Sequence, residues 1–225
     1  MIKFTNTSVM NFENAIRGAR NPMNSWAKSD SEFHCNEIFA CDADCKYYDS
    51  GCNPQNGVYI GPNDMDLLKK LRKAGPDHRK FMRQILVSVD ICAPLYWWKE
   101  MDQYRVAVVS NSCSTMHKIH SDPFTTDNFS TDHMTEPTKE FMEVVTERLE
   151  AIRQKYMLAG KHKEDWYDMI QLLPSSYNQL RTVTMNYETL VNMYHARKNH
   201  KLQEWHELCA WIEKLPYAKE LIIAE

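Results

Sequence analysis

The chain has 225 residues, of which 43% are hydrophobic and 25% are charged, as in an ordinary globular protein. Its formal net charge of -3 provides no basic surface for long nucleic acids or anionic membranes, and no apolar run approaches the roughly 20 residues of a membrane span. The N-terminal residues have no signal-peptide character, so we expect a cytoplasmic protein with one α/β or α+β domain over residues 1–225.

Seven cysteines are an odd number in a chain without an export signal, which favours reduced thiols over a disulfide framework. Four of them, Cys35, Cys41, Cys45 and Cys52, lie in the polar segment 21–61, which we interpret as an irregular Cys-rich insertion. They are separated by five, three and six residues, whereas structural zinc sites pair ligands about two to four residues apart. We therefore predict no metal site, and keep an interaction module built on this segment as an alternative.

Two helices are predicted on either side of this insertion. Apolar residues three and four positions apart predict a helix over 7–19, which Pro22 ends because the residue before a proline avoids helical geometry. After a small hairpin around 58–60, Asn63 reads as the N-cap of a second helix, which stops near Gly75.

The middle of the chain alternates between structured and irregular segments. Alternating apolar residues predict a strand over 85–91, and an aromatic helix is expected over 95–106. Hydroxyl, amide and thiol groups gather in 107–116, which we interpret as a binding loop. After the irregular segment 121–135, a long helix is expected over 136–158. We expect its apolar face to contain Phe141, Val145, Leu149, Ile152 and Tyr156.

Four further elements complete the expected fold. A short helix over 166–173 ends at Pro174, and a strand follows over 182–185. Asn186 is placed to cap the next helix, and a last amphipathic helix covers 202–212.

The C-terminal part carries motif residues in a fixed order: Leu173-Pro174, Thr184-Met185-Asn186, Leu190, Asn192, Arg197 and Gln203. This succession resembles the C-terminal half of flavin-dependent thymidylate synthases, the ThyX family, and the spacing agrees without gaps. Upstream, His78 and the helix end Gln103-Tyr104-Arg105 fall where the family has its flavin-contacting histidine and its Arg-His-Arg motif. With one inserted residue, Asn111 and Ser114 fall on the Asn and Ser of the family's Asn-Glu-x-Ser motif.

The resemblance implies an α+β fold in which helices pack on an antiparallel sheet, and a homotetramer with sites between subunits. It also implies FAD as cofactor, with NADPH and methylenetetrahydrofolate as co-substrates for the reductive methylation of deoxyuridylate (dUMP), a pyrimidine nucleotide. Flavin contacts are assigned to His78, Arg105, Asn186 and Asn192, and nucleotide contacts to Tyr104, Asn111, Cys113, Ser114, Arg197 and Gln203. A catalytic role is assigned to Arg197.

The chain departs from the family in its arginines. Family members carry the signature R-H-R-x-x-S-x-N-E-x-S-x-R, because nucleotide phosphates and flavin pyrophosphate require charge-assisted donors. Of these arginines this chain keeps only Arg105; Thr115 or Met116 stands at the last one, and Ile170 stands where the family has a further arginine before Leu-Pro. The alternative is therefore a non-catalytic homologue that still binds flavin or nucleotide.

Overall fold

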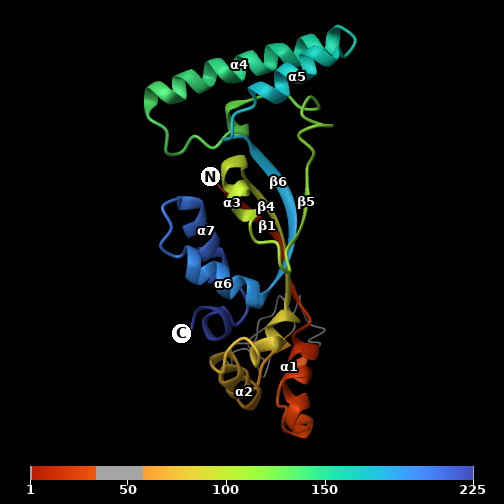
Figure 1. Cartoon of the computed structure of the whole chain (residues 1–225), viewed down its shortest axis with the longest axis vertical. Coiled ribbons are helices and arrows are strands. Elements are labelled where there is room, and N and C mark those ends of the chain that lie inside the picture. The colour runs from red at the N-terminus through yellow and green to blue at the C-terminus, as the bar shows by residue number, and fades with distance from the viewer. Residues whose placement is uncertain (1, 34–57, 225) are drawn as a thin grey trace, which may run out of the picture. The chain divides into compact units, whose positions relative to one another are not determined.

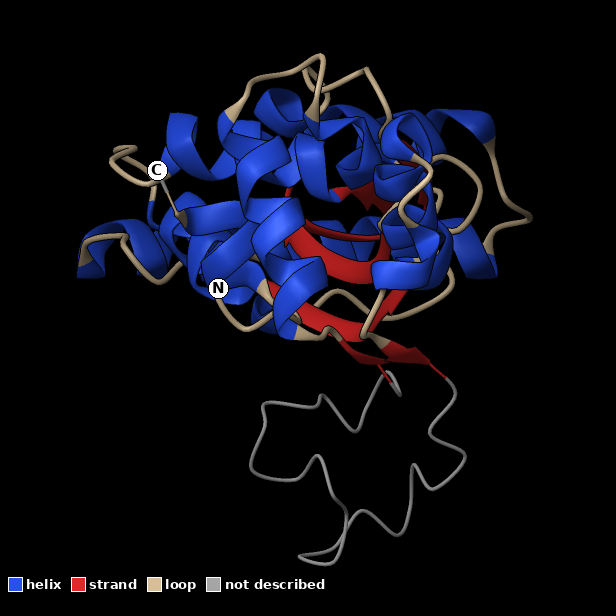
Figure 2. Ribbon diagram, turned by 90° about the horizontal axis from the view of Figure 1, so that it is seen from below, coloured by secondary structure: helices blue, strands red, loops and turns tan. Residues whose placement is uncertain are grey.

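The computed structural model of the chain describes residues 2–33 and 58–224. A four-stranded sheet has the order β1-β4-β6-β5, and two short strands, β2 and β3, form an antiparallel pair. The strands are β1 (Lys3–Met10), β2 (Glu32–Phe33), β3 (Val58–Tyr59), β4 (Leu86–Pro94), β5 (Val109–Ser112) and β6 (Asn178–Asn186). Helices pack against the strands (Figure 2), which confirms the predicted α+β class. The four cysteines of the predicted insertion lie outside the described residues.

Seven α-helices are present in the described ranges (Figure 1): α1 (Phe12–Arg20), α2 (Pro62–Lys73), α3 (Leu95–Met101), α4 (Glu136–Leu158), α5 (Lys163–Leu172), α6 (Tyr187–Arg197) and α7 (Gln203–Ile212). Short 3₁₀ helices are η1 (Asn21–Met23), η2 (Trp26–Lys28), η4 (Arg79–Arg83) and η5 (Thr126–Asn128), and η6 (Lys219–Ile223) is a π-helix. In the ranges that the structure describes, none of these helices has the length and apolar content needed to cross a membrane.

The central pair of strands, β4 and β6, is antiparallel. At one end the Leu95 N–H donates to the Tyr177 carbonyl at 3.0 Å, and at the other the Tyr187 N–H donates to the Ile85 carbonyl at 3.1 Å. The residue numbers of both pairs sum to 272, which is the signature of one continuous antiparallel register. The alternating residues of 85–91 are fully buried as predicted, and they hold the two strands against the core.

The described residues cluster into two compact units. Unit 1 contains 2–5, 90–105 and 110–183, and unit 2 contains 6–33, 58–89, 106–109 and 184–224. Each of the four strands of the main sheet contributes residues to both units.

The core of unit 2 contains a group of aromatic rings that fixes the start of α6. The Phe12 ring meets the rings of Tyr187 and Tyr217 edge-on, with centroid distances of 5.7 and 5.9 Å. The Tyr187 hydroxyl donates to the Pro216 carbonyl at 2.6 Å, and burial raises the pKa of Tyr187 well above its usual value. Because Tyr187 is the first residue of α6, this packing also fixes the position of Asn186 immediately before it.

The beginning of α2 is capped from a distant segment, not by Asn63 as predicted. The N-cap position is Gly61, and the Asp30 carboxylate accepts hydrogen bonds from the backbone N–H groups of Asn63 and Asp64, at 2.9 and 3.0 Å. A Cβ at Gly61 would lie 2.3 Å from the Asp30 carbonyl oxygen, so only glycine fits there. The Asp30 carboxylate thus accepts from first-turn backbone N–H groups that have no partner within the helix. In most helices a side chain at the N-cap position does this.

Unit 1 is built on the antiparallel packing of α4 and α5, which lie side by side in Figure 1. Its buried core contains Ile119, Phe124, Phe129, Met142, Leu149, Ile152 and Met169. The long helix over 136–158 is confirmed, but Phe141 is 65% exposed and does not share its buried face. Met142 and Thr146 are buried in its place. In the first turns of the helix, the buried face is therefore shifted by one residue from the predicted apolar face.

Several predicted boundaries are wrong, and the helix expected from 166 and the strand expected from 182 begin at Lys163 and Asn178. Residues 7–10 belong to strand β1, and the left-handed Asn11 (φ 75°) separates this strand from α1. Helix α3 ends at Met101, five residues earlier than predicted, because the next N–H groups, those of Gln103 and Tyr104, donate to carbonyls three residues back and so form turns instead of a further helical turn. The predicted loop 107–116 includes strand β5, so its first half is part of the sheet.

Glu150 on α4 gives unit 1 a dependence on pH. Its carboxylate accepts two hydrogen bonds of 2.7 Å from Arg153 and one of 2.9 Å from the Phe124 N–H, and the Arg153 hydrogen bonds lower its pKa to about 2. A depressed carboxylate pKa contributes stability that is present above the unfolded pKa of about 4.3 and is lost as the pH falls through about 2. We expect Glu150→Gln to flatten the loss of stability between pH 5 and pH 2, as measured by urea unfolding. Equal pH slopes for variant and wild type would contradict this.

Candidate ligand-binding site

The ten predicted site residues divide evenly between the two units. Unit 2 contains His78, Asn186, Asn192, Arg197 and Gln203, and unit 1 contains Tyr104, Arg105, Asn111, Cys113 and Ser114. The two sets are described separately below.

In unit 2, Asn186 acts as the predicted N-cap of α6. Its side-chain oxygen accepts hydrogen bonds from the Thr189 N–H at 2.9 Å and from the Thr189 hydroxyl at 3.1 Å. The residue is 6% exposed, so the cap fixes its rotamer. Because the oxygen is occupied by the cap, the amide N–H groups are what Asn186 can offer to a ligand.

His78 directly precedes η4 and is exposed, and the helix that follows it contains a pair of arginines that sequence reasoning missed. Arg79 and Arg83 both donate to the carboxylate of Glu188 on α6, the former at 3.2 Å through Nε. Burial would raise the pKa of Glu188, but hydrogen bonds and charge from Arg83 and Arg79 outweigh it and lower that pKa. Glu188 therefore stays ionised and holds two guanidinium groups beside the first turn of α6, with one positive charge left over. The basic run 79–83 was the available signal, but its partner is more than 100 residues away in sequence.

Arg197 and Gln203 lie on either side of the turn between α6 and α7. The Arg197 guanidinium carbon lies 4.2 Å from the centre of the Trp205 ring, and Trp205 is fully buried. This stacking fixes the plane of the guanidinium against the first turn of α7. Gln203 is the exposed first residue of α7, and Asn192 is exposed on α6. Arg197 therefore places a cation, and Gln203 a carboxamide, at the two ends of the turn that joins α6 and α7.

In unit 1, the peptide of Cys113 is held on both sides. Its N–H donates to the Leu180 carbonyl at 2.9 Å, and its carbonyl accepts from the Gln179 side chain at 2.8 Å. Ser114 uses its hydroxyl to accept from the His117 N–H at 3.0 Å, which closes a turn. Cys113 and Asn111 are both exposed, so this turn and the end of β5 offer polar groups to solvent.

Tyr104 and Arg105 follow the end of α3. The Tyr104 N–H donates to the Met101 carbonyl at 3.0 Å, and the Arg105 N–H donates to the Gln103 carbonyl at 3.1 Å. Arg105 is exposed, and Tyr104 is partly buried. The segment is therefore a tight turn that continues from the helix end.

Two solved structures match nearly the whole chain. Both are of thymidylate synthase X (ThyX) from Helicobacter pylori with FAD and dUMP; one is 15% identical, covers 99% of this chain and 97% of its own, and has a TM-score of 0.67. The other is 16% identical, with coverages of 98% and 97% and the same TM-score. The fold is that of ThyX. No protein-family model matches the sequence, and no curated protein matches it significantly.

Within this ThyX fold, the departures from the family's arginines have a structural counterpart. Ile170 is partly buried and packs against the hydrophobic core of unit 1. A guanidinium at that position would have to extend past the core surface to keep its water.

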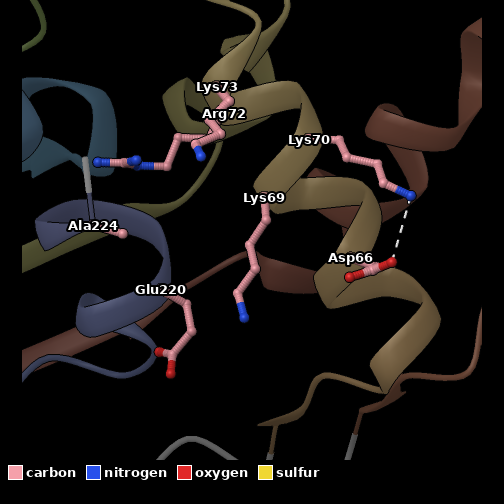
Figure 3. Close-up of a pocket in the computed structure, with 7 residues that line it drawn as sticks. All are labelled: Asp66, Lys69, Lys70, Arg72, Lys73, Glu220 and Ala224. Atoms are coloured by element: carbon pink, nitrogen blue, oxygen red, sulfur yellow. Dashed lines mark ion pairs between the residues drawn. The ribbon is translucent and has the colours of Figure 1, made fainter.

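A cavity of about 260 Å³ in unit 2 lies between α2 and η6. It is lined by Asp66, Lys69, Lys70, Arg72, Lys73, Glu220 and Ala224 (Figure 3), and by none of the predicted site residues. Arg72 donates to the carbonyls of Leu221 and Ile222 at 2.8 and 3.1 Å, so it joins the two walls. The cations cluster at the C-terminal end of α2, where the helix dipole favours positive charge. Their placement therefore needs no ligand to account for it.

Proposed function

We propose that this protein is an enzyme of the flavin-dependent thymidylate synthase type, which reductively methylates dUMP or a related pyrimidine nucleotide. The observation that carries the proposal is the ungapped spacing from Leu173 to Gln203, which falls on β6, α6 and α7 of a ThyX fold. The matched structures contain FAD and dUMP, which supports the same pair of ligands here.

The donor groups of unit 2 fit a flavin chemically. Flavin ring edges and a pyrophosphate require N–H donors and cations, and these are supplied by His78, Asn186, Asn192 and the arginines of η4. Arg105 of unit 1 is proposed as a further flavin contact. FAD, when bound, would supply the redox step, with NADPH as hydride source and methylenetetrahydrofolate as methylene source.

For the nucleotide we propose Arg197 as the main charged contact and the catalytic residue. Its guanidinium is oriented by Trp205 and can stabilise negative charge on the phosphate or pyrimidine ring. Tyr104, Asn111, Cys113, Ser114 and Gln203 are proposed as the remaining nucleotide contacts. Residues 1–225 are proposed to form one functional domain that acts in the cytoplasm as a homotetramer.

A second candidate function is a homologue that binds flavin or nucleotide without catalysis. The apolar contact of the partly buried Ile170 with the unit 1 core favours it, because no phosphate-binding cation stands at that position. An interaction module on the Cys-rich segment falls outside the described residues.

Two measurements test the proposal. We expect the purified protein to bind FAD, seen as quenching of flavin fluorescence and a rise in melting temperature, because binding to the folded state stabilises it. With NADPH and methylenetetrahydrofolate, it should release tritium from [5-³H]dUMP. Absence of FAD binding would overturn the proposed enzyme, and absence of both FAD and dUMP binding would also overturn the non-catalytic homologue. FAD binding without tritium release would select the non-catalytic homologue.

A further inference from the structure

Arg181 on strand β6 is the centre of a hydrogen-bonded network in unit 1. Its guanidinium carbon lies 4.2 Å from the centre of the Trp98 ring, and its side chain is 14% exposed. Nε donates to the Gln179 side-chain oxygen at 2.9 Å, and Nη1 donates to the Asp102 carboxylate at 2.8 Å. The stacking and the two hydrogen bonds together fix the plane of the guanidinium.

One arm of this network reaches the turn that contains Cys113 and Ser114. Gln179 is 7% exposed, and because its oxygen accepts from Arg181, its amide nitrogen must face the other way. That nitrogen donates to the Cys113 carbonyl at 2.8 Å. Arg181 therefore sets the orientation of the amide group that holds the Cys113 peptide.

The other arm reaches the end of α3. Asp102 is the C-cap residue of this helix, and it precedes Tyr104 and Arg105 by two and three positions. The Trp98 indole N–H donates to the Gln179 carbonyl at 3.0 Å, so the same helix is also joined to β6 one turn earlier. The pair of Asp102 with Arg181 thus fixes where the segment 103–105 leaves the helix.

We propose that Arg181 is a positioning residue for the nucleotide-binding groups of unit 1. It holds the 113–114 turn through Gln179 and the 104–105 segment through Asp102, so that both are ordered before a ligand binds. This inference rests on the proposed function for its ligand, dUMP, but not for its geometry. Lysine cannot replace the arginine, because an ammonium group lacks the planar fork that serves both arms at once.

Three variants separate the two arms. Arg181→Met removes both, Asp102→Asn weakens only the arm to 103–105, and Arg181→Lys keeps the ion pair with Asp102 but loses the bridge to Gln179. The matched control is Arg148→Met, at an exposed position on α4 in the same unit. Amide hydrogen exchange resolved by mass spectrometry reports on each segment, and calorimetry gives the dUMP dissociation constant.

We expect Arg181→Met to speed exchange about tenfold at Cys113 and across 103–105, and to weaken dUMP binding about tenfold. Arg181→Lys should affect Cys113 alone, Asp102→Asn should affect 103–105 alone, and Arg148→Met should change nothing. Unchanged exchange at both segments overturns the inference even if dUMP binds, and faster exchange with unaltered dUMP affinity overturns its functional part. A wild-type protein that binds neither dUMP nor a related pyrimidine nucleotide overturns the proposed function, while exchange still decides the role of Arg181. If Arg181→Met does not fold, the two single-arm variants decide.

Discussion

Arg197→Ala is expected to lower kcat/KM for dUMP by about 10²- to 10³-fold, the cost of removing one donor that stabilises transition-state charge. The guanidinium is held 4.2 Å above the fully buried Trp205 ring, so its plane is fixed before a nucleotide arrives. Pre-organised charge is most effective in such an arrangement, because no reorganisation is needed during the reaction. The measurement is steady-state tritium release from [5-³H]dUMP.

The same substitution separates the proposed catalytic role of Arg197 from a structural one. Loss of the stacking on Trp205 should cost only about 0.5–1 kcal/mol of stability, and FAD affinity should stay near that of wild type. Arg197→Lys keeps the charge without the fork and should recover only part of the activity. Arg17→Ala, at an exposed position on α1 in the same unit, is the control. If the activities of Arg197→Ala and Arg17→Ala are equal, Arg197 has no part in the reaction.

Elements with strong local signals were predictable from the sequence. Helix α4 begins and ends where a proline in its first turn and its apolar periodicity place it, and Asn186 caps α6 as its position after a strand indicates. Strand β1 was missed because most of its residues are exposed and polar, so its conformation depends on pairing within the sheet. Phe141 was assigned to the wrong face of α4 because it and its neighbour Met142 are both apolar. Near the helix end, the three- and four-residue spacing is consistent with either residue on the buried face.

The candidate site was predictable only as far as family motifs reach. Asn186, Arg197 and their spacing were visible in the chain, whereas the roles of Arg83 and Arg181 were not. Their partners, Glu188 and Asp102, are 105 and 79 residues away in sequence, and no local periodicity links such pairs. Ion pairs of this kind follow from the fold and are recognised only once the strands and helices are in place.

Asp64→Ala is expected to destabilise the protein by about 3–5 kcal/mol, the usual cost of removing one partner of a buried ion pair. Asp64 is 0% exposed and Arg20 is 4% exposed, and the Arg20 Nε donates to the carboxylate at 2.5 Å. The other carboxylate oxygen accepts from the hydroxyls of Ser29 and Ser31, at 2.7 and 2.6 Å. Removal of Asp64 therefore leaves a buried guanidinium and two hydroxyls without their acceptor.

The Asp64 carboxylate also makes the stability of the protein depend on pH. Burial acts to raise the pKa of Asp64, but hydrogen bonds from Ser31, Ser29 and Arg20 outweigh it and hold the pKa below its usual value. Its stabilisation is accordingly present above the unfolded pKa of about 3.9 and is lost as the pH falls through the lower folded value.

Urea unfolding at pH 7 should show the full loss of stability in Asp64→Ala, and the difference from wild type should shrink in acid. Asp66→Ala is the control, because the Asp66 side chain is 73% exposed and pairs with Lys70 at the surface. This substitution should lower the free energy of unfolding by less than about 0.5 kcal/mol. Comparable losses from Asp64→Ala and Asp66→Ala at neutral pH would show that the buried pair does not hold the 29–31 segment against α2.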